Sequence, residues 1–240
     1  MGNSKIYLGN TNIGSLFKGA SDISIYLGEN KVYPLGEPVF KWKATYSDSH
    51  TESAQCGSSS EIVNGEINPD NLVSVEIGDC AASIGNSVFS FCESLTSCTI
   101  GSGVTSIGSS AFFDCRGLTS ITIPDSVTSI GDNAFSDCRS LTSCTIGSGV
   151  TSIGDSAFNM CTSLTSIDIP SGVTSICDYA FQSCNSLTSI TVNATTPPTL
   201  GEYAIDDTNN CPIYVPSASL TAYQTAWPDY ASRIQAIQNS

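Results

Sequence analysis

The chain has 240 residues, of which 40% are hydrophobic and only 12% are charged, so it can bury a core while Ser, Thr, Asn and Gly supply most of its wet surface. Its 8 basic and 22 acidic residues give a net charge of −14, and an anionic chain is repelled by phosphate backbones and by anionic lipid headgroups. Nucleic-acid binding is therefore disfavoured. Direct membrane insertion is disfavoured too, because no apolar run approaches the length of about 20 residues that spans a bilayer.

Residues 1–36 contain a short repeat of their own. Ile6-Tyr-Leu-Gly9 and Ile25-Tyr-Leu-Gly28 lie 19 residues apart, and each is followed by a polar turn and another apolar residue. Apolar segments flanking a turn predict β-hairpins, so we expect a small β-hairpin module here. The stretch up to Phe17 holds a single lysine and no continuous apolar run, so no signal peptide is visible in this chain.

Residues 37–70 are predicted to form an N-terminal cap and linker. Pro34 to Pro38 is interpreted as a linker, and Phe40–Tyr46 alternates apolar and polar residues, which predicts a strand that leads into the following array. The polar stretch Ser47–Ser60 is expected to be a loop.

Residues 71–192 consist of five to six copies of a 23-residue repeat. Leucine, phenylalanine and cysteine all recur at this spacing: Leu72, Leu95, Leu118, Leu141, Leu164 and Leu187; Phe89, Phe112, Phe135, Phe158 and Phe181; Cys92, Cys115, Cys138, Cys161 and Cys184. The segment Leu95–Gly108 is repeated letter for letter at Leu141–Gly154, which marks a 46-residue superperiod. A fixed period of this length is typical of a solenoid.

The copy that begins at Leu118 shows how one repeat is expected to fold. Ile121 and Ile123 alternate with polar residues, which predicts a half-buried strand, and the proline after them turns the chain. Further along, Phe135 and Cys138 lie close enough for one short helical turn to bury both. No copy covers its own apolar edges, so stacked copies must cover one another.

The repeat pattern LxxIxIPxxVxxIGxxAFxxCxx resembles the BspA-like leucine-rich repeats of bacterial surface proteins, and the match spans roughly residues 71–192. The segment Cys211–Pro216 and the helical stretch after it are similar to the C-terminal closure of those proteins. The resemblance implies a leucine-rich-repeat solenoid of short strands, turns and short helical segments. It also implies surface display and attachment to host proteins or other cells.

Residues 193–240 are expected to be a C-terminal cap. Leu200-Gly201 falls one place late in the repeat, and Ile213–Val215 is predicted to be a last strand. Ser217 or Ser219 is a candidate N-cap of a helix through Trp227, which Pro228 kinks or splits. Repeat arrays need such an end to cover their final apolar face.

The 11 cysteines do not form metal motifs, because the chain has no C-x-x-C pair and His50 is its single histidine. The five cysteines of the repeat are predicted to be buried, reduced thiols, and Cys98 and Cys144 to act as small hydrophobic residues on a strand. Cys56 and Cys80 lie outside the repeat and are the best candidates for a disulfide, although the sequence leaves open whether they are bonded.

Candidate sites for chemistry all have simpler explanations. His50 with Asp48 and Glu52 is interpreted as part of a solvated loop, and no G-x-S-x-G motif is present. The run 206–210 offers oxygen ligands for calcium but lacks their regular spacing, so a polar loop is favoured. We therefore predict no catalytic residue, no metal site and no cofactor.

The outward face of the repeat strands carries hydroxyl-rich columns, which are the candidate binding strip: Ser97, Thr99, Ser120, Thr122, Ser143, Thr145, Ser166 and Asp168. The simpler interpretation is that a solvent-facing strand needs polar residues with high β-propensity, such as threonine. Both interpretations remain open from the sequence.

These observations favour a non-enzymatic binding or adhesion protein at the cell surface or in the extracellular space, which contacts a protein or glycan on another cell or particle. A phage or prophage decoration or fibre protein, anchored to the virion by its N-terminal module, is the alternative. Ice binding by the Ser/Thr columns is a third hypothesis. The ligand and the oligomeric state are not specified by the sequence.

Overall fold

The computed structural model describes residues 6–7, 24–27, 30–34, 40–56, 61–63 and 65–238. They fall into two compact units, Met1–Val39 and Phe40–Ser240. In the first unit β2 (Ser24–Leu27) and β3 (Asn30–Pro34) pair antiparallel, as expected for the second hairpin. The short strand β1 (Ile6–Tyr7) pairs in parallel with β2, which the expectation of two separate hairpins did not include. The rest of the first predicted hairpin lies outside the described residues.

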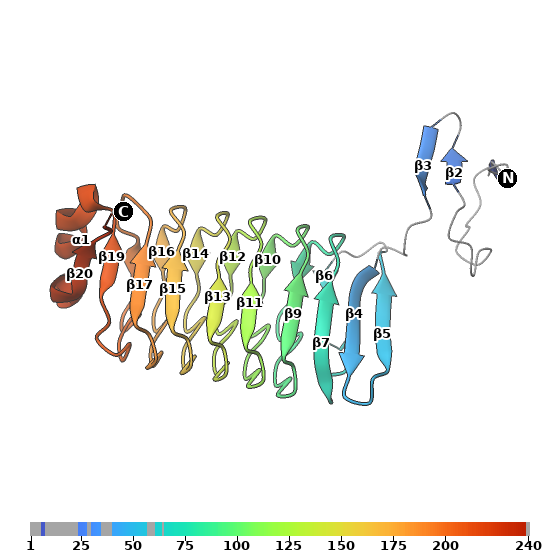
Figure 1. Cartoon of the computed structure of the whole chain (residues 1–240), viewed down its shortest axis with the longest axis horizontal. Coiled ribbons are helices and arrows are strands. Elements are labelled where there is room, and N and C mark those ends of the chain that lie inside the picture. The colour runs from blue at the N-terminus through green and yellow to red at the C-terminus, as the bar shows by residue number, and fades with distance from the viewer. Residues whose placement is uncertain are drawn as a thin grey trace. The chain divides into compact units, whose positions relative to one another are not determined.

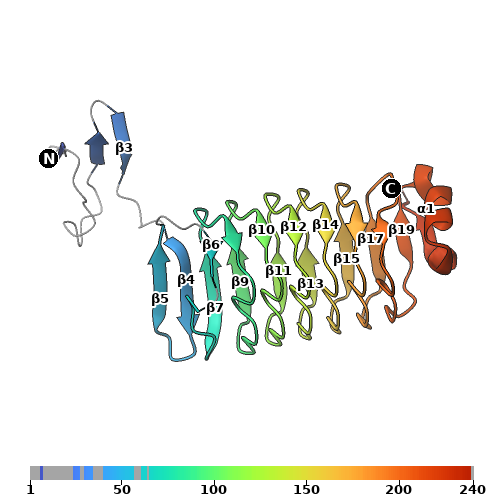
Figure 2. The same ribbon diagram turned by 180° about the vertical axis from the view of Figure 1, so that it is seen from behind.

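The second unit is a β-solenoid whose coils stack in chain order (Figures 1 and 2). Each repeat adds a longer strand to one side of the solenoid and a two-residue strand to a continuous parallel sheet on another side. The longer strands are β7 (Leu72–Ile77), β9 (Ser97–Ile100), β11 (Ser120–Thr122), β13 (Ser143–Thr145), β15 (Ser166–Ile169), β17 (Ser189–Val192) and β19 (Ile213–Val215). Their parallel ladder is interrupted between β13 and β15. The short strands are β6 (Glu61–Ile62), β8 (Ser83–Ile84), β10 (Ser106–Ile107), β12 (Ser129–Ile130), β14 (Ser152–Ile153), β16 (Ser175–Ile176) and β18 (Thr199–Leu200).

The register of both sheets follows the repeat. Ser106 pairs with Ser129, and Ile130 pairs with Ile153, so equivalent residues of successive copies lie side by side. The last short strand is displaced by one residue, since Ile176 pairs with Leu200, which confirms the one-residue insertion expected there.

The third side of each coil is an arch of successive turns that buries one phenylalanine and one cysteine. The rings of Phe112, Phe135 and Phe158 stack nearly parallel with centroids 5.1 and 5.2 Å apart, and all three side chains are fully buried. The sequence prediction of a buried phenylalanine in this register is confirmed. Flat rings fit a stack of identical coils because the strand spacing, about 4.8 Å, is close to the distance at which offset rings pack.

The arch is not the short helical turn expected from the sequence. Each arch holds two non-glycine residues in the left-handed region, for example Asn133 (φ 55°) and Asp137 (φ 60°), which interrupt any helix. The backbone N–H of Asn133 donates to the carbonyl of Asp155 (2.7 Å), so the arch is held by the next coil. Contacts between coils therefore outweigh the local preference for a right-handed turn.

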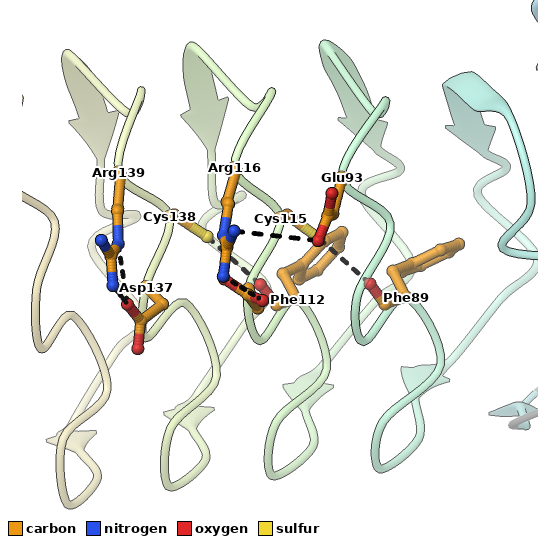
Figure 3. Close-up of polar contacts among 9 residues, drawn as sticks. Phe89, Glu93, Phe112, Cys115, Arg116, Asp137, Cys138 and Arg139 are labelled. Atoms are coloured by element: carbon orange, nitrogen blue, oxygen red, sulfur yellow. Dashed lines mark hydrogen bonds and ion pairs between the residues drawn. The ribbon is translucent and has the colours of Figure 1, made fainter.

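The cysteines of the arches are free thiols, as predicted. The thiol of Cys115 donates to the carbonyl of Phe89 in the preceding coil (3.0 Å), and Cys138 donates in the same way to Phe112 (3.2 Å; Figure 3). A buried carbonyl thus gains a partner that the repeat spacing alone did not reveal. Neighbouring thiols and burial raise the pKa of Cys115 well above its ordinary value, so this thiol stays protonated.

The N-terminal end of the solenoid is closed by an antiparallel pair. β4 (Phe40–Tyr46) pairs antiparallel with β7 on one side and with β5 (Thr51–Gln55) on the other. The expectation that 47–60 is entirely a loop is therefore wrong, because β5 gains ladder hydrogen bonds from β4 that its polar sequence does not indicate. Cys56 at the end of β5 forms a disulfide with Cys80 of the first repeat coil.

A buried ion pair fixes the same end. The ammonium of Lys41 lies 2.8 Å from Oε1 and 2.7 Å from Oε2 of Glu66, and the indole N–H of Trp42 donates to Oε2 (3.1 Å). Lys41 also donates to the carbonyl of Glu61 (3.0 Å), so its charge is paired and hydrogen-bonded.

The C-terminal cap consists of a 3₁₀ turn (Ser217–Ser219), α1 (Leu220–Ala226), a second 3₁₀ segment (Pro228–Arg233) and β20 (Ile234–Ala236), so Pro228 does split the helix. Ser219 precedes α1, but it makes no side-chain cap; its hydroxyl donates to the carbonyl of Thr195 (2.6 Å). Tyr223 and Trp227 donate in the same way to the carbonyls of Ala194 (2.8 Å) and Pro198 (3.1 Å). Their spacing of four residues puts all three donors on one helical face. The corner that departs from the repeat is therefore the docking surface of the cap.

Candidate functional site

The eight residues of the predicted strip lie on four successive strands, β9, β11, β13 and β15, and all eight are exposed. Ser97, Ser120 and Ser143 are register partners, and Thr122 is the partner of Thr145. The structure therefore brings these side chains together on one face of the long-strand sheet. Apolar residues between them, such as Ile121, point into the core.

Both columns of the strip extend beyond the predicted residues. Toward the N-terminus, Ser74 and Glu76 of β7 pair with Ser97 and Thr99, and Lys43 of β4 pairs with Glu76. Toward the C-terminus, Asp168 of β15 pairs with Thr191. Ser74 and Thr191 could have been predicted from the sequence, because they lie in the 23-residue register of the strip. Lys43 could not, because it lies on an antiparallel strand outside the repeat.

Threonines at the edge of the strip are locked by the preceding coil. The hydroxyl donates to the carbonyl of the equivalent residue one repeat earlier, as from Thr142 to Thr119 (3.0 Å) and from Thr188 to Thr165 (2.9 Å). Such bonds hold the side chains in one rotamer. The edge of the strip is thus held in place by contacts between successive coils.

A hollow of about 220 Å³ interrupts the strip between β9 and β11. Its lining is Cys98, Thr99, Ile100, Ser120, Ile121 and Thr122. The ladder between these two strands pairs at Ser97 and Ser120 alone, whereas β7 and β9 share four register pairs and β11 and β13 share three. The strands separate beyond that pair, and Cys98 becomes partly exposed.

A proline corner accompanies this separation. In the sixth copy the N–H of Asn193 donates to the carbonyl of Ile169 in the preceding coil (3.0 Å). Pro124 stands at the equivalent place, and it has no N–H to donate to Ile100. The ladder also lacks register pairs between β13 and β15, and there the corner residue is again a proline, Pro170.

Glycine corners therefore occur with intact ladders and proline corners with open ladders, and the two kinds alternate along the array. This alternation is the structural counterpart of the 46-residue superperiod. A side chain at Gly103 or Gly149 would overlap the carbonyl of Asp79 or Asp125 in the preceding coil, so the tight corners require glycine.

The hollow offers hydrogen bonds rather than reactive groups. Burial raises the pKa of the Cys98 thiol above its ordinary value, which slows its reactions as a nucleophile near neutral pH. The other five residues that line it contribute hydroxyls, backbone groups and aliphatic surface. The strip and its hollow are thus suited to recognition.

His50 lies at the turn between β4 and β5, as expected for an exposed position. Its ring stacks on Tyr46 (centroids 4.2 Å apart), and it is paired with Asp48, which lowers the pKa of that carboxyl group. Burial and the nearby Glu52 carboxylate raise the pKa of Tyr46 to about 12. These contacts satisfy one another and do not converge on a cavity, which fits the solvated-loop interpretation.

The loop considered for calcium lines a polar hollow of about 410 Å³ with Ser183, Asn185, Asp207, Asn209 and Asn210. Asp207 is the single carboxylate of this lining. Within the described ranges of the chain, no three His, Cys, Asp or Glu side chains converge in a group suited to a metal ion. In the same part of the chain, no helix has the length and apolar character needed to cross a bilayer.

The chain also matches a protein-family model. The model of the BspA type leucine rich repeat region matches residues 68–224 in six copies. The chain belongs to this family. The resemblance expected from the repeat pattern and the leucine-rich-repeat fold are both confirmed. A comparison with curated proteins finds no significant match.

Solved structures with a similar fold are bacterial leucine-rich repeat proteins. The pneumococcal vaccine antigen PcpA is 15% identical, with a TM-score of 0.54 over 92% of this chain and 50% of its own. A leucine-rich repeat protein from Eubacterium ventriosum is 20% identical, with a TM-score of 0.50 over 83% of this chain and 52% of its own. One from Bacteroides ovatus is 23% identical, with a TM-score of 0.49 over 73% and 50%. The chain spans about half the length of these three proteins.

Proposed function

We propose that this chain is a non-enzymatic binding module displayed at the cell surface, which contacts a protein or glycan on another cell or particle. The observation that carries the proposal is the exposed strip of hydroxyl columns on the long-strand sheet. A shallow polar surface that spans several coils suits a macromolecule better than a small substrate, which needs an enclosing pocket.

Two further observations support the proposal. The Cys56–Cys80 disulfide is of a kind that persists in oxidising compartments such as the extracellular space. The antigen PcpA, which has the same fold, is described as a vaccine antigen. The alternative role as a virion component depends on residues 1–36, most of which lie outside the described residues.

The experiment compares the wild-type chain with two matched double variants on arrays of glycans and host surface proteins. Ser120→Arg with Ser143→Arg places two bulky charges in the strip. Thr128→Arg with Thr151→Arg places them on exposed positions of the same two coils, before the short strands. Melting temperatures measured by circular dichroism verify that each variant is folded.

We expect the strip variant to lose the partner that the wild type binds, while the control variant retains it. Equal binding by all three proteins would exclude the strip as the contact surface, and a wild-type protein without any bound partner would contradict the proposed function itself.

A further inference from the structure

A third cavity, of about 240 Å³, lies between the last coil of the solenoid and its C-terminal cap. Glu202 and Tyr203 line it from the coil, and Pro228, Asp229 and Tyr230 line it from the cap. This cavity is separate in sequence from the strip and takes no part in the function proposed above.

An exposed aromatic stack marks the cavity. The ring of Tyr203 is 51% exposed and stacks on Tyr179, with centroids 5.4 Å apart and an interplanar angle of 17°. Four preceding copies place a small polar residue at this position of the arch: Ser87, Ser110, Asn133 and Ser156. The two coils nearest the cap thus replace a small residue with tyrosine.

The backbone makes this replacement notable. Tyr179 and Tyr203 have φ values of 58° and 55°, in the left-handed region, where bulky side chains are rare and asparagine is favoured. Burial does not explain the choice of tyrosine, because Tyr203 is half exposed. Every arch has this left-handed conformation, so what sets the last two coils apart is the tyrosine itself, and the exposed ring of Tyr203 borders the cavity.

The charge of the cavity indicates which kind of ligand it would bind. Glu202 and Asp229 are both exposed, and neither has an ion-pair partner among the residues that the structure describes. The nearby cation, Arg233, is occupied: it donates to the carbonyl of Cys211 (2.9 Å) and to the hydroxyl of Thr208 (2.7 Å). The cavity therefore presents an aromatic face beside two carboxylates that form no ion pair with Arg233, whose guanidinium lies 5.6 Å from the ring centroid of Tyr230.

We propose that this cavity binds an arginine side chain in a basic segment of a partner protein. A guanidinium group stacks on an aromatic face and donates paired hydrogen bonds to carboxylates, so one side chain satisfies Tyr203, Glu202 and Asp229 together. The net charge of −14 attracts such a segment over a longer range. A neutral sugar would satisfy the ring but leave both carboxylates without a cation.

The test measures binding of a fluorescent peptide in which arginine alternates with glycine and serine, by anisotropy at low and at physiological salt. The matched peptide carries citrulline, which has nearly the shape of arginine but no charge. The variants are Tyr203→Ser, which restores the residue of the repeat, Tyr203→Phe and Asp229→Asn. Two controls lie outside the cavity: Phe91→Ser removes an exposed ring at the other end of the array, and Asp132→Asn removes an exposed carboxylate.

We expect the arginine peptide to bind about tenfold more tightly than the citrulline peptide. Tyr203→Ser and Asp229→Asn should each weaken it by about fivefold, while Tyr203→Phe and both controls leave it unchanged. The strip variant Ser120→Arg with Ser143→Arg should retain more than half of the affinity, so the two proposals fail independently.

Equal affinity for the two peptides would overturn the inference. So would an equal loss in Asp132→Asn and Asp229→Asn, because it would show attraction by the overall charge and not by the cavity.

Discussion

Replacing Phe135 by alanine is the most direct test of how the solenoid is stabilised. Its ring is fully buried between Phe112 (5.1 Å between centroids, 6° between planes) and Phe158 (5.2 Å, 10°). Loss of a buried phenylalanine costs about 3–5 kcal/mol, and each stacked pair adds about 0.5–1.5 kcal/mol beyond the buried area. Because two pairs are lost together, we expect a decrease of about 4–5 kcal/mol in the free energy of unfolding, at the upper end of that range.

Urea unfolding followed by circular dichroism measures this loss over the whole array. Trp42 lies in the N-terminal cap and Trp227 in the C-terminal cap, and they are the two tryptophans of the chain, so fluorescence reports on both ends. Phe91→Ala is the matched control, since Phe91 is 61% exposed and its loss should cost less than about 1 kcal/mol. A cost below about 1 kcal/mol for Phe135→Ala, or one equal to that of Phe91→Ala, would refute the view that the stacked rings hold the coils together.

Four further outcomes are expected. Alkylation under denaturing, non-reducing conditions should label nine cysteines, and four or more disulfides by intact mass would contradict the free thiol ladder. Replacing Cys56 and Cys80 by serine should lower the free energy of unfolding by about 2–4 kcal/mol in urea titrations, and an unchanged midpoint would show that the link constrains nothing. Burial raises the pKa of Tyr223 to about 12, against an ordinary value of 10.0. As the pH rises, Tyr223 loses its proton earlier in the unfolded chain than in the folded protein. The free energy of unfolding should therefore keep its full value below pH 10 and decrease between pH 10 and 12, and this decrease should be smaller in Tyr223→Phe. Pro124→Asn supplies the missing N–H and should slow alkylation of Cys98 in the native protein; an unchanged rate would mean that the hollow has another cause.

The repeat could be predicted from the sequence because stacking in register leaves each position with one environment. Every coil places the same residue beside its equivalent in the next, so a position that faces the core must be apolar in all copies. Phe135 and Cys138 occupy such core positions and are buried, whereas Ser120 occupies a position that faces solvent in every copy. The left-handed residues of the arch escaped prediction, because the hydrogen bonds that hold them come from the neighbouring coil.

The features outside the periodic register were decided by tertiary structure alone. The pairing of Thr51–Gln55 with β4 and the cavity beside Tyr203 each join segments that share no repeat, so no spacing in the sequence relates them. The sequence named Cys56 and Cys80 as disulfide candidates, but the fold alone brings the two together. The hollow beside Cys98 is an intermediate case. The 46-residue superperiod can be seen in the sequence. The hollow itself depends on how Pro124 lies against the preceding coil, which only the folded structure shows. A sequence records what recurs along the chain, whereas a contact between unlike segments exists only after the chain has folded.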